Sequence, residues 1–142
     1  MEEKYLYFRT VADQDDNDGI DDSVYVKASS ITGMFPTSAT AITIFFESVK
    51  NQAGNGTDDE NVISDSVIIN HTAGLGKQVM HTIVRAINST APLYNDGVIT
   101  VADDVTTTYL TSTAGADETV SAQYIDGGIT SCGAITVAAA LS

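Results

Sequence analysis

Apolar and polar residues alternate in short segments along most of this chain, and this period of two residues constrains the fold more than any other feature. The clearest case is 40–47, TAITIFFE, in which Ile42, Ile44 and Phe46 share one face. Successive side chains of a strand point to opposite faces of a sheet, so the pattern predicts a half-buried strand. Comparable segments, most of them bounded by Gly, Asn, Asp or Pro, predict strands at 4–9, 23–28, 61–72, 97–102, 119–125 and 133–139.

Residues 75–89 form the one segment with a clear helical period. At 100° per residue, its apolar side chains cover about 180° of a helical wheel, and polar side chains fill much of the remainder. About seven strands and one amphipathic helix predict an α+β, mostly β protein. We expect an antiparallel sandwich or partial barrel, with the helix covering one face or opening. The length of 142 residues and the absence of a linker-like segment predict a single domain, 1–142.

The chain is strongly acidic, with 6 Lys and Arg against 19 Asp and Glu and a formal net charge of −13. Binding to nucleic acid or to an anionic membrane relies on cations, so we expect neither partner. The sequence has no basic and apolar leader of the secretory type, no apolar run that approaches 18 residues, and a single cysteine, Cys132. These features predict a protein that is made in a cytoplasm and is not secreted.

Six of the acidic residues lie in 13–22, DQDDNDGIDD. Asp13, Asp15 and Asn17 have the alternating spacing of oxygen ligands that opens an EF-hand loop, and Asp18 adds a carboxylate. The rest of that motif is missing, because its glycine position holds Asp18 and its twelfth position holds Val24 in place of glutamate. The segment therefore predicts either a solvated turn or a Ca²⁺ or Mg²⁺ site of another kind, since a divalent cation relieves repulsion between clustered carboxylates. No other cofactor is expected.

The cations of the second part of the chain are concentrated on the predicted helix. After residue 50 the sequence has ten acids but only two Lys or Arg, Lys77 and Arg85, with His81 midway between them. A spacing of four residues places all three on one side of a helix. Two interpretations remain open: a helix surface neutralised by the protein's own carboxylates, or a partner-binding ridge for an acidic neighbour in an assembly.

Catalytic motifs are largely missing from this sequence, which predicts that the protein is not an enzyme. His71 and His81 have no second ligand at zinc-binding spacing, and no nucleophile elbow, phosphate-binding loop or dinucleotide fingerprint is present. Cys132 lies in a segment of small residues and is expected to be a buried or half-buried thiol. A remote alternative is an unrecognised enzyme that uses Asp103, Asp104 or His71.

Four segments carry a resemblance to a known group of proteins: YLYFRTVAD (5–13), ITGMFPTSATAITIFF (31–46), ISDSV (63–67) and ITVADD (99–104). Together they resemble small virion-associated proteins of tailed phages that infect marine cyanobacteria, and the likeness extends over most of the chain. The resemblance implies a virion structural protein, foremost a capsid decoration or cement protein on the assembled shell. Its expected partners are the major capsid protein or other virion proteins, and a homo-oligomer is compatible with this role.

A second class of function stays open within the same particle. A tail or neck component, or a module that faces a receptor, would also be acidic, rich in β-structure and free of catalytic motifs. The 18 Thr and 12 Ser of the chain, together with Tyr94, Tyr109 and Tyr124, suit contact with carbohydrate.

Overall fold

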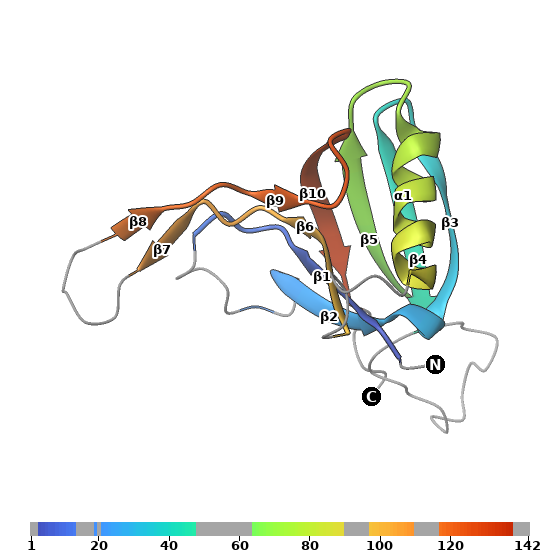
Figure 1. Ribbon diagram of the computed structural model, residues 1–142, viewed down its shortest axis with the longest axis horizontal. Helices are drawn as coiled ribbons and strands as arrows, with labels where there is room; N and C mark the ends of the chain where they lie inside the picture. The colour runs from blue at the N-terminus through green and yellow to red at the C-terminus, as the bar shows by residue number, and fades with distance from the viewer. Residues whose placement is uncertain are drawn as a thin grey trace.

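The structure is a computed structural model that describes residues 3–13, 19, 21–47, 64–89, 97–109 and 117–137. Within these residues it is mostly β, with two four-stranded sheets, a separate strand pair and one α-helix (Figure 1). The helix does not have the length and apolar character that are needed to cross a membrane. The predicted fold class, a mostly β protein with one amphipathic helix, is confirmed.

The first sheet has the strand order β2-β1-β6-β9. β1 pairs antiparallel with β2 and parallel with β6, and β6 pairs antiparallel with β9 over two residues on each strand. Its strands are β1 (Tyr5–Arg9), β2 (Ser23–Lys27), β6 (Val98–Asp103) and β9 (Gln123–Tyr124).

The second sheet has the order β10-β5-β4-β3 and is antiparallel throughout. Its strands are β3 (Ile31–Ser38), β4 (Ala41–Glu47), β5 (Ser64–His71) and β10 (Ile129–Thr136). A short 3-10 helix (Ala28–Ser30) connects β2 of the first sheet to β3 of this one. The remaining strands, β7 (Thr107–Tyr109) and β8 (Asp117–Thr119), pair with each other as a separate two-stranded sheet.

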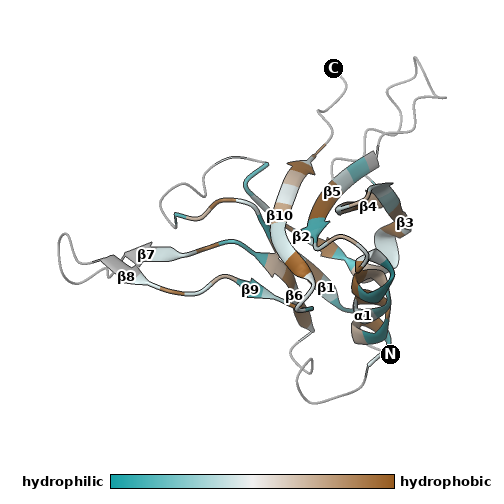
Figure 2. Cartoon of the chain, turned by 90° about the horizontal axis from the view of Figure 1, so that it is seen from above, coloured by the Kyte–Doolittle hydropathy of each residue, from teal (hydrophilic) through white to brown (hydrophobic). Residues whose placement is uncertain are grey.

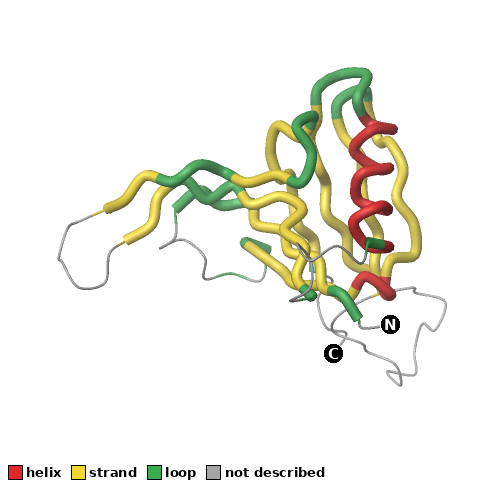
Figure 3. The backbone as a smooth tube through the Cα atoms, viewed as in Figure 1, coloured by secondary structure: helices red, strands yellow, loops and turns green. Residues whose placement is uncertain are grey.

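One apolar core joins the two sheets and the helix α1 (Gly76–Asn88), which lies along the second sheet (Figure 3). Phe8 of β1 packs edge-on against Phe46 of β4, with ring centroids 5.9 Å apart, and so connects the sheets directly. The core consists of inward residues of both sheets and of α1: Leu6, Phe8, Val26, Ile42, Ile44, Phe46, Val67, Ile69, Val79, Ile83, Ala86, Ile99, Val101, Ala102, Ile129, Cys132 and Ile135. The sheets do not close into a barrel, so the arrangement is a sandwich with a helix beside it.

The predicted count of about seven strands is close to the eight strands of the two sheets, and the separate pair of β7 and β8 adds two more in the described residues. The prediction misses β3, which contains Gly33 and Pro36 and is exposed along much of its length. Proline is tolerated there because β3 is the edge strand of its sheet. The strand expected at 119–125 is also wrong: the structure places the end of β8 and the short β9 in this segment.

Candidate functional site

The helix α1 places its apolar and polar residues on opposite sides. Val79, Ile83 and Ala86 are buried in the core, and the outward side is exposed. The helix follows a turn in which Gly74 has a φ of +87°, a conformation that glycine adopts without strain. At the other end, the backbone N–H of Ser89 bonds the carbonyl of Ala86 and closes the last turn.

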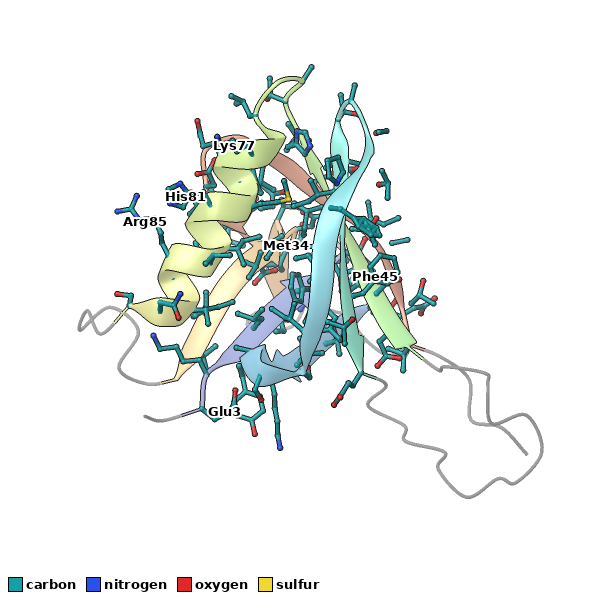
Figure 4. The ribbon with its side chains drawn as sticks, turned by 90° about the vertical axis from the view of Figure 1, so that its right-hand side faces the viewer. Glu3, Met34, Phe45, Lys77, His81 and Arg85 are labelled. Carbon is teal, nitrogen blue, oxygen red and sulfur yellow. The ribbon has the colours of Figure 1, made fainter. Side chains whose placement is uncertain are left out.

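The outward side of α1 carries the predicted cationic residues. Lys77, His81 and Arg85 are all exposed and project along one side of the helix, away from the sheet (Figure 4). Val84 precedes Arg85 in the sequence, and 43% of its surface is exposed. We name these four residues the basic face: Lys77, His81, Val84 and Arg85.

The carboxylates of the described residues do not neutralise the basic face. Asp126 is the carboxylate that lies against α1, and it accepts hydrogen bonds from neutral groups, Gln78 Nε2 at 2.9 Å and Thr82 Oγ1 at 2.6 Å. Neither Lys77 nor Arg85 forms an ion pair with any acid in the described ranges. The part of the chain that the structure describes therefore shows no carboxylate that neutralises Lys77 or Arg85.

Two other cations of the described residues are occupied within the molecule. The ammonium of Lys4 donates to the carbonyl oxygens of Ala86 and Ile87, at 3.2 and 3.1 Å, and to that of Ser89. Arg9 is buried, and its guanidinium donates to the carbonyls of Val11 and Asp13 at 3.0 and 2.8 Å. Both side chains therefore satisfy backbone acceptors and contribute to the fold rather than to an outer surface.

The predicted cation ligands lie mostly outside the described residues, which exclude Asp15, Asn17 and Asp18. Asp13 is half-buried, and its Oδ1 accepts no hydrogen bond from the residues that the structure describes. Further along the same turn, Asp22 accepts a hydrogen bond of 2.6 Å from the backbone N–H of Gly19. Within the described ranges no three His, Cys, Asp or Glu side chains come together as a metal site.

A polar cluster that the sequence does not predict lies between the two sheets. Asp104 Oδ1 accepts hydrogen bonds from the Tyr124 hydroxyl at 2.6 Å and from the Cys132 backbone N–H at 3.0 Å. Thr10 adds a bond from its Oγ1 to the carbonyl of Cys132 at 3.1 Å. Burial and the neighbouring carboxylate of Asp104 raise the pKa of the Cys132 thiol to about 12, and the same two causes raise the pKa of Tyr124. The expectation that Cys132 is buried or half-buried is confirmed, at 4% exposure. Asp104 is half-buried and accepts hydrogen bonds from both sheets.

The three residues of the remote enzyme alternative, His71, Asp103 and Asp104, each make different contacts in the described structure. His71 ends β5, is 4% exposed, and donates from Nδ1 to the carbonyl of Thr72 at 2.8 Å. Its ring packs against Gly76 at the start of α1, where a methyl group would lie 3.2 Å from two ring atoms. Asp103 accepts a bond from the backbone N–H of Val105 at 3.0 Å, and Asp104 belongs to the polar cluster.

Three tyrosines form an aromatic patch on the outer face of the first sheet. Tyr7 and Tyr25 are cross-strand partners with ring centroids 4.6 Å apart, and Tyr5 lies two residues before Tyr7 on the same face of β1. Tyr25 is 57% exposed. Of the tyrosines expected to face carbohydrate, Tyr94 and the side chain of Tyr109 lie outside the described residues, and the hydroxyl of Tyr124 is bonded to Asp104.

Comparisons with known proteins add no relative. No protein family matches this chain, and no match is found among curated proteins or among solved structures.

Proposed function

We propose that this protein is a structural component of a tailed-phage particle and, within the particle, a decoration protein that binds and stabilises the assembled shell. The single observation that carries the proposal is the basic face of α1, whose cations are not paired with any described carboxylate of a chain with net charge −13. Cations that no described carboxylate pairs favour an acidic partner. The resemblance of the sequence to virion proteins of cyanobacterial phages supplies the kind of assembly.

The charge distribution suits a protein that is soluble alone and bound in the particle. A net charge of −13 favours solubility of the free protein. An exposed cationic ridge with Val84 at its edge offers both the charge and an apolar contact for a partner surface. Because a decoration protein binds the assembled shell and not the loose subunit, it stabilises the shell by mass action.

Purified particles test this proposal. We expect a copy number near that of the major shell protein, and a lower melting temperature for particles that lack the protein. Adding back the wild-type chain should restore the melting temperature, whereas K77E/R85E should restore less of it. Lys27→Glu changes an exposed cation outside α1 and is the matched control. Absence of the protein from particles would overturn the proposal.

The tyrosine patch favours one alternative, a tail, neck or receptor-facing module that contacts carbohydrate. Aromatic rings present a flat apolar surface, and tyrosine hydroxyls add hydrogen-bonding groups at its rim. Tyr5, Tyr7 and Tyr25 provide such a surface on the first sheet. A copy number of a few per particle, together with loss of glycan binding in Tyr25→Ala, would favour this alternative over decoration of the shell.

A further inference from the structure

A two-stranded arm extends from the end of the molecule opposite to α1 (Figure 1). The chain leaves β6, forms β7, returns as β8 and rejoins the first sheet at β9. We define the arm as 105–109 together with 117–122. Its register pairs Thr107 with Thr119 and Tyr109 with Asp117, and Val120 N–H bonds the carbonyl of Thr106 at 3.0 Å.

The arm is supported at its base and is two-stranded further out. At the base, the backbone N–H groups of Thr106 and Thr107 both lie within bonding distance of the carbonyl of Ala12, at 2.8 and 3.1 Å. Beyond the bridge between Asp13 and Thr107, β7 and β8 pair only with each other in the described structure. A lone two-stranded hairpin is marginally stable in water and gains stability when it packs on a further element. The outer arm is therefore a segment that would be stabilised by a partner surface.

The arm and the basic face have opposite charge. The arm segments contain two acids, Asp117 and Glu118, both in β8, and no Lys, Arg or His. The basic face has Lys77 and Arg85, which no described carboxylate pairs. Colouring by hydropathy shows β7 as pale rather than brown, and shows teal, hydrophilic residues along α1 (Figure 2).

We propose that the arm of one copy docks on the basic face of α1 of a second copy. The arm and α1 lie at opposite ends of the folded molecule, so the arm cannot reach the helix of its own chain (Figure 1). The contact must therefore form between two copies. Such a head-to-tail contact uses two different surfaces, and it produces a ring when the rotation closes and a chain when it does not. Val84, which is 43% exposed beside these cations, adds an apolar group to the contact. This inference rests on the proposed function, because it identifies the acidic partner of the basic face as a neighbouring copy of the protein on the assembled shell.

Isolated protein with reversed charges tests the contact. One variant reverses the helix (K77E/R85E) and another reverses the arm (D117K/E118K). Sedimentation velocity at low salt should show self-association of the wild type. We expect each variant alone to associate at least about tenfold more weakly, because like charges then meet at the contact. Higher salt should weaken the wild-type association, since exposed charges are screened.

Mixing and recombination of the variants separate this contact from general charge repulsion. The helix variant has an acidic arm and an acidic helix, and the arm variant has a basic arm and a basic helix. In the mixture each arm therefore meets a helix of opposite charge on the other variant, and we expect the mixture to associate more strongly than either variant alone. A chain that carries all four reversals should likewise regain self-association. Lys27→Glu and Asp21→Lys, which alter exposed charges elsewhere, should leave association unchanged.

Three outcomes would overturn the inference. They are a wild type that stays monomeric up to millimolar concentration at low salt, a helix or arm variant that associates as the wild type does, and a fourfold variant that does not recover. Circular dichroism and thermal melting verify that each variant folds, and D117N/E118Q offers a milder change of the arm. If the inference fails while particles still contain the protein at shell-like copy number, the proposed decoration function stands without it.

Discussion

The hydroxyl of Tyr124 donates a hydrogen bond of 2.6 Å to Oδ1 of Asp104 and ties β9 to the end of β6. The same carboxylate also accepts from the backbone N–H of Cys132 in β10, so one side chain joins three strands from both sheets. A carboxylate that accepts several bonds in a half-buried position contributes more than a neutral acceptor does. Asp104 is therefore a fixed point between the two sheets, at the base of the arm.

Replacing Asp104 with alanine should lower the free energy of unfolding by about 2–3 kcal/mol, because two donors lose a charged acceptor. Tyr124→Phe removes one of these bonds and should cost about 1 kcal/mol. Urea unfolding of the two single variants and the double variant measures the coupling between them. Strictly additive effects would show that the bond contributes nothing of its own.

The Lys4 ammonium should stabilise the C-terminal end of α1. It donates to the carbonyls of Ala86, Ile87 and Ser89, where the helix dipole places partial negative charge. Lys4→Met keeps the length of the side chain and removes these bonds, and we expect a loss of about 1 kcal/mol in thermal or urea unfolding. Lys27→Met is the control, since Lys27 is exposed on β2. Equal stability of the two variants would contradict a capping role for Lys4.

The sequence predicts the elements of this fold whose signal is local. The helical period of 75–89 predicts both the buried side of α1 and the exposure of Lys77, His81 and Arg85, because a helix places residues by spacing alone. The alternation in 40–47 predicts β4 for the same reason. The same wheel groups Val84 with the apolar side chains, but Val84 is 43% exposed, because helical spacing does not determine how much of the apolar side the sheet covers.

The arm and the Asp104 cluster could not be predicted in this way. β8 contains two adjacent acids, Asp117 and Glu118, which are poor strand formers and favour interpretation as a turn. Asp104, Tyr124 and Cys132 are separated by 20 and 8 positions, and no periodic pattern relates them. Only the pairing of β6 with β9 and the approach of β10 bring them together.

The Cys132 thiol should be almost unreactive in the folded protein. Burial first, and the Asp104 carboxylate second, raise its pKa to about 12, and only the thiolate reacts with alkylating reagents. Each unit of pKa lowers the thiolate fraction tenfold, so at pH 8 we expect labelling by iodoacetamide to be at least about a hundredfold slower than in the urea-unfolded chain. Mass spectrometry of the time course measures both rates. Comparable rates in the two states would contradict a buried thiol.

Asp126 should make the attachment of α1 sensitive to acid. Burial acts to raise the pKa of this carboxyl, but the hydrogen bonds from Thr82, the Gly128 N–H and Gln78 outweigh it and leave the pKa below its ordinary value. A lowered pKa in the folded state means that the carboxylate stabilises the fold above the ordinary value of about 4, and that this contribution is lost as the pH falls through the folded value.

We therefore expect Asp126→Ala to be less stable than the wild type by about 1–2 kcal/mol at pH 7, because three donors lose their acceptor. The difference should shrink below about pH 4, where the wild-type carboxylate takes up its proton. Urea unfolding of both proteins between pH 7 and pH 3 measures the two curves, and Asp21→Ala, on an exposed turn, is the control. A stability difference that does not change over this range would show that Asp126 acts through packing and not through its charge.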